Sequence, residues 1–139
     1  MGGGPLVSIF NDPVKVALVK TLDAAALRQR VIADNIANAD TPGFKKGVVL
    51  FETALRQALR GDPLPLRTTD PRHFGNNSLS NIVPRVERLN TTTQRADGNN
   101  VDVEEEMVNL VTNTLTYQAA VRFLTGKLSS LRYVISGGR

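Results

Sequence analysis

Two long segments of the chain repeat apolar residues at the spacing of an α-helix. The first repeat advances in alternating steps of four and three through Leu18, Leu22, Ala25, Gln29, Ile32 and Ile36. Asn11 or Asp12 can cap this helix, and Pro13 is tolerated at its first position because the missing amide hydrogen would be unpaired there anyway. The pattern predicts a helix over residues 13–38.

The C-terminal repeat is more regular. Its stripe follows the same four-three spacing through Val103, Met107, Leu110, Thr114, Tyr117, Val121, Leu124, Leu128, Leu131 and Ile135. This spacing is typical of a coiled coil. Asp102 and Glu105 have the positions of a capping box, and Gly137 and Gly138 can end the helix. The sequence therefore predicts a second helix over residues 102–136.

The segment between these helices, residues 39–101, has a different character. Apolar residues at helical spacing predict a short helix over residues 48–60, ended by Gly61, Asp62 and Pro63. Prolines and Asn-rich clusters then interrupt every long period, which predicts loops over residues 62–100 with short strands near 64–68 and 82–89.

Length decides the predicted shape. A helix over residues 102–136 would be about 50 Å long, whereas a compact globule of this chain length is roughly 35–40 Å across. We therefore expect one mainly α, elongated domain over residues 1–139, in which the terminal helices form an antiparallel coiled-coil hairpin beside a loop-rich insertion. A second side of the first helix, and Val111 with Ala120 on the last helix, are interpreted as surfaces for neighbouring copies. The second side consists of Val19, Ala26, Ala33 and Ala37. We hypothesise that the hairpin becomes fully ordered only on assembly.

Composition narrows the possible chemistry. The chain of 139 residues has no Cys, which excludes disulfides and thiolate metal sites, and its net charge of +4 is scattered along the sequence. A loose basic cluster of Arg28, Arg30, Lys45 and Lys46 lacks an aromatic platform, so nucleic-acid binding is only a minor alternative. No stretch reaches the roughly 20 apolar residues of a membrane span, and the N-terminal sequence is not that of a cleaved signal peptide.

Candidate catalytic and metal-binding residues are few. His73 is the only histidine and has no acidic cluster or Cys at ligand spacing. Glu104, Glu105 and Glu106 are consecutive on a helix, so they point in different directions and cannot converge on one ion. We expect no enzyme activity, no cofactor, no metal and no small-molecule substrate.

The stretch DNIANADTPGF, residues 34–44, ends the first helix abruptly. Asn38 can end it by adopting the left-handed conformation, and Pro42 with Gly43 fits the centre of a type II turn. Neither feature explains Asn35, which lies inside the predicted helix although Asn is a poor helix former. A buried Asn35 amide that hydrogen-bonds a neighbouring backbone and fixes the register would explain it.

This stretch resembles the signature of the bacterial flagellar axial proteins, which comprise rod, hook and hook-associated proteins. Their pattern is Ala-Ser-Asn-Leu-Ala-Asn, two variable residues, then Thr-Pro-Gly-Tyr. The matching residues are Ala33, Asn35, Ala37, Asn38, Thr41, Pro42 and Gly43, while Phe44 replaces the Tyr. The C-terminal sequence, including Asn99, Tyr117 and Phe123, and the short insertion are similar to those of the smallest, proximal-rod members.

The resemblance implies a structural subunit of the flagellar basal body, exported through the type III apparatus without a cleaved signal. It implies contacts with copies of itself, with other rod proteins, and with the MS ring and export gate. The terminal helices would then assemble through one apolar stripe: Leu18, Leu22, Ile32, Ile36, Val103, Met107, Leu110, Tyr117, Val121, Leu124, Leu128, Leu131 and Ile135. Two alternatives stay open: another rod component, or a coiled-coil adaptor dimer with weak nucleic-acid binding.

Overall fold

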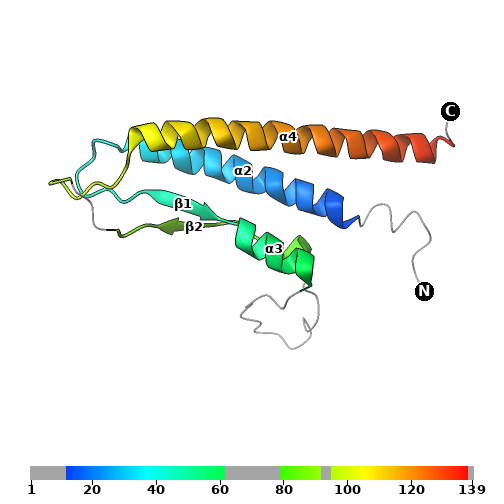
Figure 1. The fold of residues 1–139 in the computed structure, drawn as a ribbon, viewed down its shortest axis with the longest axis horizontal. Helices are drawn as coiled ribbons and strands as arrows, with labels where there is room; N and C mark the ends of the chain where they lie inside the picture. Colours follow the sequence, from blue (N-terminus) through cyan, green and yellow to red (C-terminus); the bar gives the residue numbers. More distant parts are fainter. Residues whose placement is uncertain (1–11, 62–78, 92–94, 138–139) are drawn as a thin grey trace.

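The computed structural model of the protein describes residues 12–61, 79–91 and 95–137. Two long helices, α2 (Pro13–Ala37) and α4 (Val103–Ile135), lie side by side along the molecule (Figure 1). The elements between them in sequence are β1 (Gly47–Leu50), α3 (Glu52–Arg60), the 3-10 helix η2 (Leu79–Asn81) and β2 (Arg85–Arg88). The predicted mainly α, elongated fold with a hairpin of terminal helices is confirmed.

Local capping sets the ends of α2. The Asp12 carboxylate accepts a hydrogen bond from Val14 N at 3.0 Å, and Pro13 takes the first helical position, as predicted. The predicted left-handed cap at Asn38 is wrong, because its φ is −104° and its ψ 15°. Instead, Asn38 donates to the Asp34 carbonyl from its backbone N–H and from its side-chain Nδ2, at 3.1 and 2.8 Å. These two bonds satisfy the carbonyl without a left-handed residue.

The start of α4 is capped by Asp102, whose Oδ1 accepts from the backbone N–H groups of Glu104 and Glu105 at 3.0 and 3.3 Å. The side chain of Glu105 forms an ion pair with Lys46 at 3.0 Å, which ties the first turn of α4 to the start of β1. At the other end, Gly137 has a φ of 73°, the left-handed conformation typical of a helix stop. Both ends agree with the prediction to within one residue.

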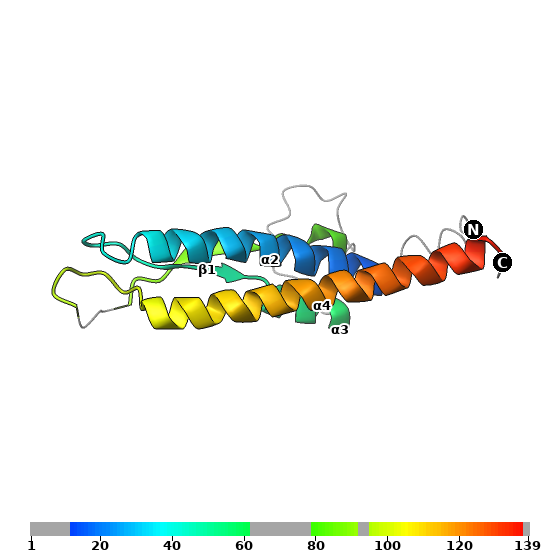
Figure 2. The ribbon, with the colours of Figure 1, turned by 90° about the horizontal axis from the view of Figure 1, so that it is seen from above.

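Three pairs of residues fix the antiparallel alignment of α2 and α4. Lys127 forms an ion pair with Asp12, Asn113 bonds to Ala25 O, and Glu106 bonds to Asn35. The hydrogen bond from the Lys127 ammonium holds the pKa of the Asp12 carboxyl below its ordinary value. Seen from above, α4 continues past the described start of α2 (Figure 2).

The residues of α4 that are fully buried are small or polar. They are Glu106, Asn113 and Ala120, which are spaced seven apart and so lie on one line along the helix. The interpretation of Ala120 as a surface for neighbouring copies is therefore wrong: it is buried within the chain, because it repeats the position of Asn113 one heptad later. Val111 is exposed.

A two-stranded antiparallel sheet follows α2. Gly47 of β1 pairs with Arg88 of β2, and Leu50 pairs with Arg85. The predicted helix over residues 48–60 therefore starts too early, because residues 48–50 belong to β1 and α3 begins at Glu52. The β2 strand lies within the strand predicted near 82–89, whereas the one predicted near 64–68 falls outside the described residues.

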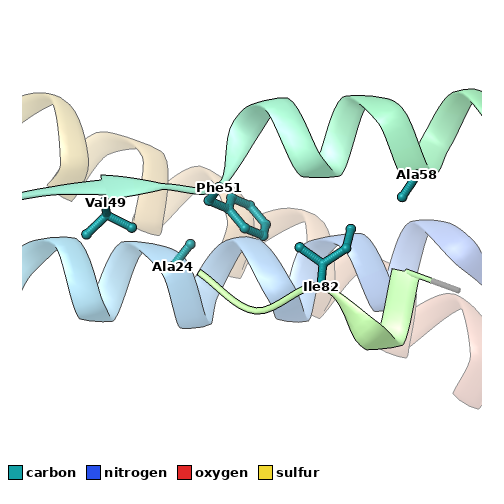
Figure 3. Packing of buried hydrophobic residues seen from close by; sticks show 5 residues of the cluster. All are labelled: Ala24, Val49, Phe51, Ala58 and Ile82. Carbon is teal, nitrogen blue, oxygen red and sulfur yellow. The ribbon is translucent and has the colours of Figure 1, made fainter. Parts of the chain in front are cut away.

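The hydrophobic core lies between α2 and the β1–α3 segment. It consists of Ala24 from α2, Val49 and Phe51 from β1 and its end, Ala58 from α3, and Ile82 next to η2 (Figure 3). The α2 helix thus carries two packed faces, one against α4 and one against the β1–α3 segment. Among the described helices, none is long and apolar enough to cross a membrane.

Candidate functional site

Asn35 joins α2 to both β1 and α4. Its Oδ1 accepts from Gly47 N at 2.8 Å, and its Nδ2 donates to Gly47 O at 2.9 Å and to the Glu106 carboxylate at 3.0 Å. The amide thus pairs with Gly47 much as a neighbouring strand would. Asn35 is only 1% exposed, so these bonds form without competing water. This arrangement explains why an amide stands on the buried face of a helix.

The close approach of β1 to α2 also depends on Gly47. A Cβ atom at this position would lie 3.0 Å from Cγ1 of Val31, which is closer than ordinary van der Waals contact. The strand can therefore reach the Asn35 amide only because residue 47 has no side chain.

A tight turn follows the helix. Thr41 N donates to Asn38 O at 3.0 Å, and Phe44 N donates to Thr41 O at 3.3 Å. Gly43, the third residue of the second turn, has a φ of 73°. The bond across residues 41–44 and the positive φ are the features of the predicted type II turn.

Asn99, just before α4, fastens this turn. Its Nδ2 donates to the carbonyls of Asn38, Ala39 and Thr41 at 2.8–2.9 Å, and its Oδ1 accepts from Val101 N at 2.8 Å. The side chain is fully buried, at 0% exposure. The turn that ends α2 and the loop that precedes α4 are therefore one hydrogen-bonded unit, which we call the Asn99 latch.

Further bonds strengthen the latch. Gly43 N donates to Asp97 O at 2.7 Å, and Arg95 Nη1 donates to Ala39 O at 2.9 Å. Asn100, next in the chain, accepts from Lys46 N and donates to Leu89 O, both at 2.7 Å, and so links the outer ends of β1 and β2. The sequence singled out Asn99 only by resemblance. The Asp-Gly-Asn-Asn cluster at 97–100 was the available signal for a structured turn.

The motif residues divide into an inner and an outer group. Asn35 and Asn38 make the hydrogen bonds described above, and the half-buried Phe44 ring lies 5.1 Å from the Arg88 guanidinium in a cation–π contact. The outer group is exposed and consists of Ala33 and Ala37 of α2 and of Thr41, Pro42 and Gly43 in the turn.

The predicted stripe residues are distributed over more than one face. Ile32 is buried. Half-buried are Leu18, Leu22, Ile36, Leu110, Leu124 and Leu131, and exposed are Val103, Met107, Tyr117, Val121, Leu128 and Ile135. Most of the exposed ones lie roughly a quarter-turn around α4 from the line of Glu106, Asn113 and Ala120 at 3.6 residues per turn. The stripe therefore only partly coincides with the contact between α2 and α4.

The basic cluster behind the nucleic-acid alternative is largely engaged within the chain. Arg28 forms an ion pair with Glu52 at 2.7 Å, Lys45 donates to Gly98 O at 2.5 Å, and Lys46 pairs with Glu105. In the described part of the chain, no group of three or more His, Cys, Asp or Glu side chains could hold a metal ion. His73 lies outside that part.

Two glycines offer a matched test of the turn. Replacing Gly43 with alanine is expected to destabilise the protein by about 1–2 kcal/mol, because its φ is 73° and no atom lies within 4 Å of the added Cβ, so the cost is backbone strain alone. Gly126 lies inside α4 and also has no atom within 4 Å of an added Cβ. Its replacement by alanine is expected to stabilise the protein by about 1 kcal/mol. Urea denaturation measures both changes. Equal effects of the two substitutions would contradict the positive φ of the turn in solution.

Comparisons with known proteins identify a family whose matched region includes this motif. The family described as "Flagella basal body rod protein" matches residues 17–45, which include the whole motif. The chain is 37% identical over 133 residues to the flagellar basal body rod protein FlgB of Bacillus subtilis (strain 168), covering 96% of this chain and 100% of that protein. It is 37% identical to FlgB of Borrelia hermsii (93% and 99% covered) and 36% identical to FlgB of Aeromonas hydrophila (84% and 87% covered).

Proposed function

The chain belongs to the FlgB family of flagellar basal body rod proteins, and from this premise we propose that its two long helices polymerise into the proximal rod, the shaft that transmits torque from the MS ring. It is a structural subunit of the basal body rod and not an enzyme. As a rod protein it assembles with other components of the rod. We further propose that its neighbours include copies of itself, the MS ring and the export gate, and that the type III apparatus exports it.

One observation carries the assembly role. The outward face of α4 exposes a series of large apolar side chains that have no cover within the described chain: Val103, Met107, Val108, Val111, Leu115 and Val121. They lie on the part of α4 from Val103 to Val121 and point away from the α2 contact. A contiguous exposed apolar face of this kind is typical of a surface that is buried by a partner.

The other rod components and the adaptor dimer are less well supported. The relatives compared above are all FlgB proteins, which favours this rod position over a sister component. An adaptor dimer would close on itself through one two-fold interface, whereas rod subunits make head-to-tail contacts that propagate. The internal engagement of Arg28, Lys45 and Lys46 removes the main support for nucleic-acid binding.

Deletion of the gene tests the rod role first. We expect electron microscopy of basal bodies from the deleted strain to show rings without a rod, in non-motile cells that the intact gene restores. Complete rods in swimming cells would contradict the proposal.

Substitution of Met107 by aspartate tests the exposed face. Met107 is 50% exposed, so the variant is expected to fold with unchanged helicity by circular dichroism. A carboxylate buried without a partner at a subunit contact costs several kcal/mol, so we expect the variant to lose rods and motility. Thr53→Asp, exposed on α3 and outside this face, is the control and should swim. Normal swimming of Met107→Asp would contradict the role of this face.

A further inference from the structure

A groove runs between α2, β1 and α4 on the side of α4 away from the exposed apolar face. Its volume is about 290 Å³. Its floor includes Ile32, Gly47, Glu106 and Asn113, and Asn109, Thr112 and Thr116 of α4 form part of its rim. This volume is at the lower limit for small-molecule sites, which span about 300–1,000 Å³. The groove is therefore better matched to one long side chain than to a cofactor.

Asn113, a residue of the groove lining, carries an unpaired hydrogen-bond acceptor. Asn113 is 4% exposed, and its Oδ1 is buried with no hydrogen-bond partner in the structure. The orientation of the amide is fixed, because Nδ2 donates to Ala25 O at 2.9 Å and to Gln29 Oε1 at 3.2 Å. Rotating the amide would place Oδ1 against the Ala25 carbonyl, which cannot donate. Oδ1 is thus the atom of this amide that can still accept a hydrogen bond from a donor outside the chain.

The groove lining also holds a buried carboxylate. The Glu106 side chain lies on the same floor, two helical turns from Asn113, or roughly 10 Å along α4 at 1.5 Å per residue. Among the described residues it accepts one side-chain hydrogen bond, from the neutral Asn35 amide. Arg28, the cation in the lining, donates a hydrogen bond to Val49 O at 3.1 Å and forms an ion pair with Glu52. The groove thus combines a buried carboxylate and an unpaired carbonyl oxygen, and a cationic donor complements both.

We propose that this groove receives a lysine or arginine side chain from a second copy of this chain, with its N–H groups bonded to Asn113 Oδ1 and its charge attracted by Glu106. This inference rests on the proposed function, which places copies of the chain side by side. It assigns the second copy a polar contact on the face opposite the apolar one. Each subunit thereby offers two different surfaces, as a head-to-tail assembly requires. Exposed arginines on α4, at Arg122 and Arg132, are of the required type.

Site-specific photo-crosslinking tests the proposal. The photoreactive residue p-benzoylphenylalanine replaces Thr116, at the exposed rim, in a chain expressed together with the unaltered one, and basal bodies are isolated and irradiated. The expected product has twice the 15.1 kDa chain mass, with its attachment point in the second copy next to a lysine or arginine. The same replacement at Thr53, an exposed threonine of α3 outside the groove lining, is the control and should give little of this product.

The outcomes separate the two proposals. A crosslink within one chain, a crosslink to a different rod protein, or no crosslink, with the chain present in the basal bodies, would overturn the groove assignment and leave the rod role intact. Absence of even the unaltered chain from basal bodies would overturn the rod role, and the groove assignment with it.

Discussion

Replacing Asn35 with alanine is expected to lower the free energy of unfolding by about 3–5 kcal/mol, because three buried hydrogen bonds are lost together. The Gly47 N–H and C=O and the Glu106 carboxylate would each lose a partner in a site where Asn35 is 1% exposed. Domains of ordinary size are stable by about 5–15 kcal/mol, so this is a large share of the total. Guanidinium denaturation monitored by circular dichroism measures the change as a shift of the midpoint.

The control for this substitution is Asn109→Ala. Asn109 is an exposed amide of α4, so its replacement is expected to leave stability unchanged or to raise it by a few tenths of a kcal/mol through helix propensity. If both variants unfolded at the wild-type midpoint, Asn35 would not hold α2 to β1 and α4 in solution. A changed slope with denaturant would instead report an altered native or denatured state.

The sequence predicted those features whose causes are local. Asp12, Asp102 and Gly137 mark helix ends because a cap or stop needs only neighbours within a few residues. The overall hairpin followed from the lengths of the two periodic segments. The start of α3 was placed too early, because the strand that replaces its first turn pairs with residues 85–88, far along the chain. Alternating and helical spacing are difficult to distinguish in such short apolar runs.

The contact face of α4 was the harder prediction. The largest apolar residues suggested the stripe through Val103 and Met107, whereas the chain buries Glu106, Asn113 and Ala120 against α2. Two overlapping repeats of seven exist on this helix, and hydrophobicity alone selects the one with the larger side chains. The buried repeat depends on partners in α2, such as Asn35 and Ala25 O, which no local pattern reveals.

The hydrogen bonds of the Asn99 latch likewise depend on residues far along the chain, which no local pattern reveals. Asn99 makes the strongest single-residue prediction. Asn99→Asp changes one NH₂ group to oxygen at nearly constant volume. The new carboxylate would face the carbonyl oxygens of Asn38, Ala39 and Thr41, now 2.8–2.9 Å from the Asn99 Nδ2, in a site with 0% exposure. Three donated bonds become three repulsions, so we expect a loss of at least about 4 kcal/mol at neutral pH.

The pH dependence distinguishes this explanation from a general packing defect. A carboxyl group buried against three acceptors has a raised pKa in the folded state, since only its protonated form can donate. The deficit of Asn99→Asp relative to wild type should therefore shrink as the pH falls through that raised value, because the protonated carboxyl recovers one hydrogen bond. Asn109→Asp, exposed on α4, should show little deficit at neutral pH. A deficit of Asn99→Asp that is independent of pH, or no deficit, would mean that the Asn99 amide does not hold the turn after α2 to the start of α4.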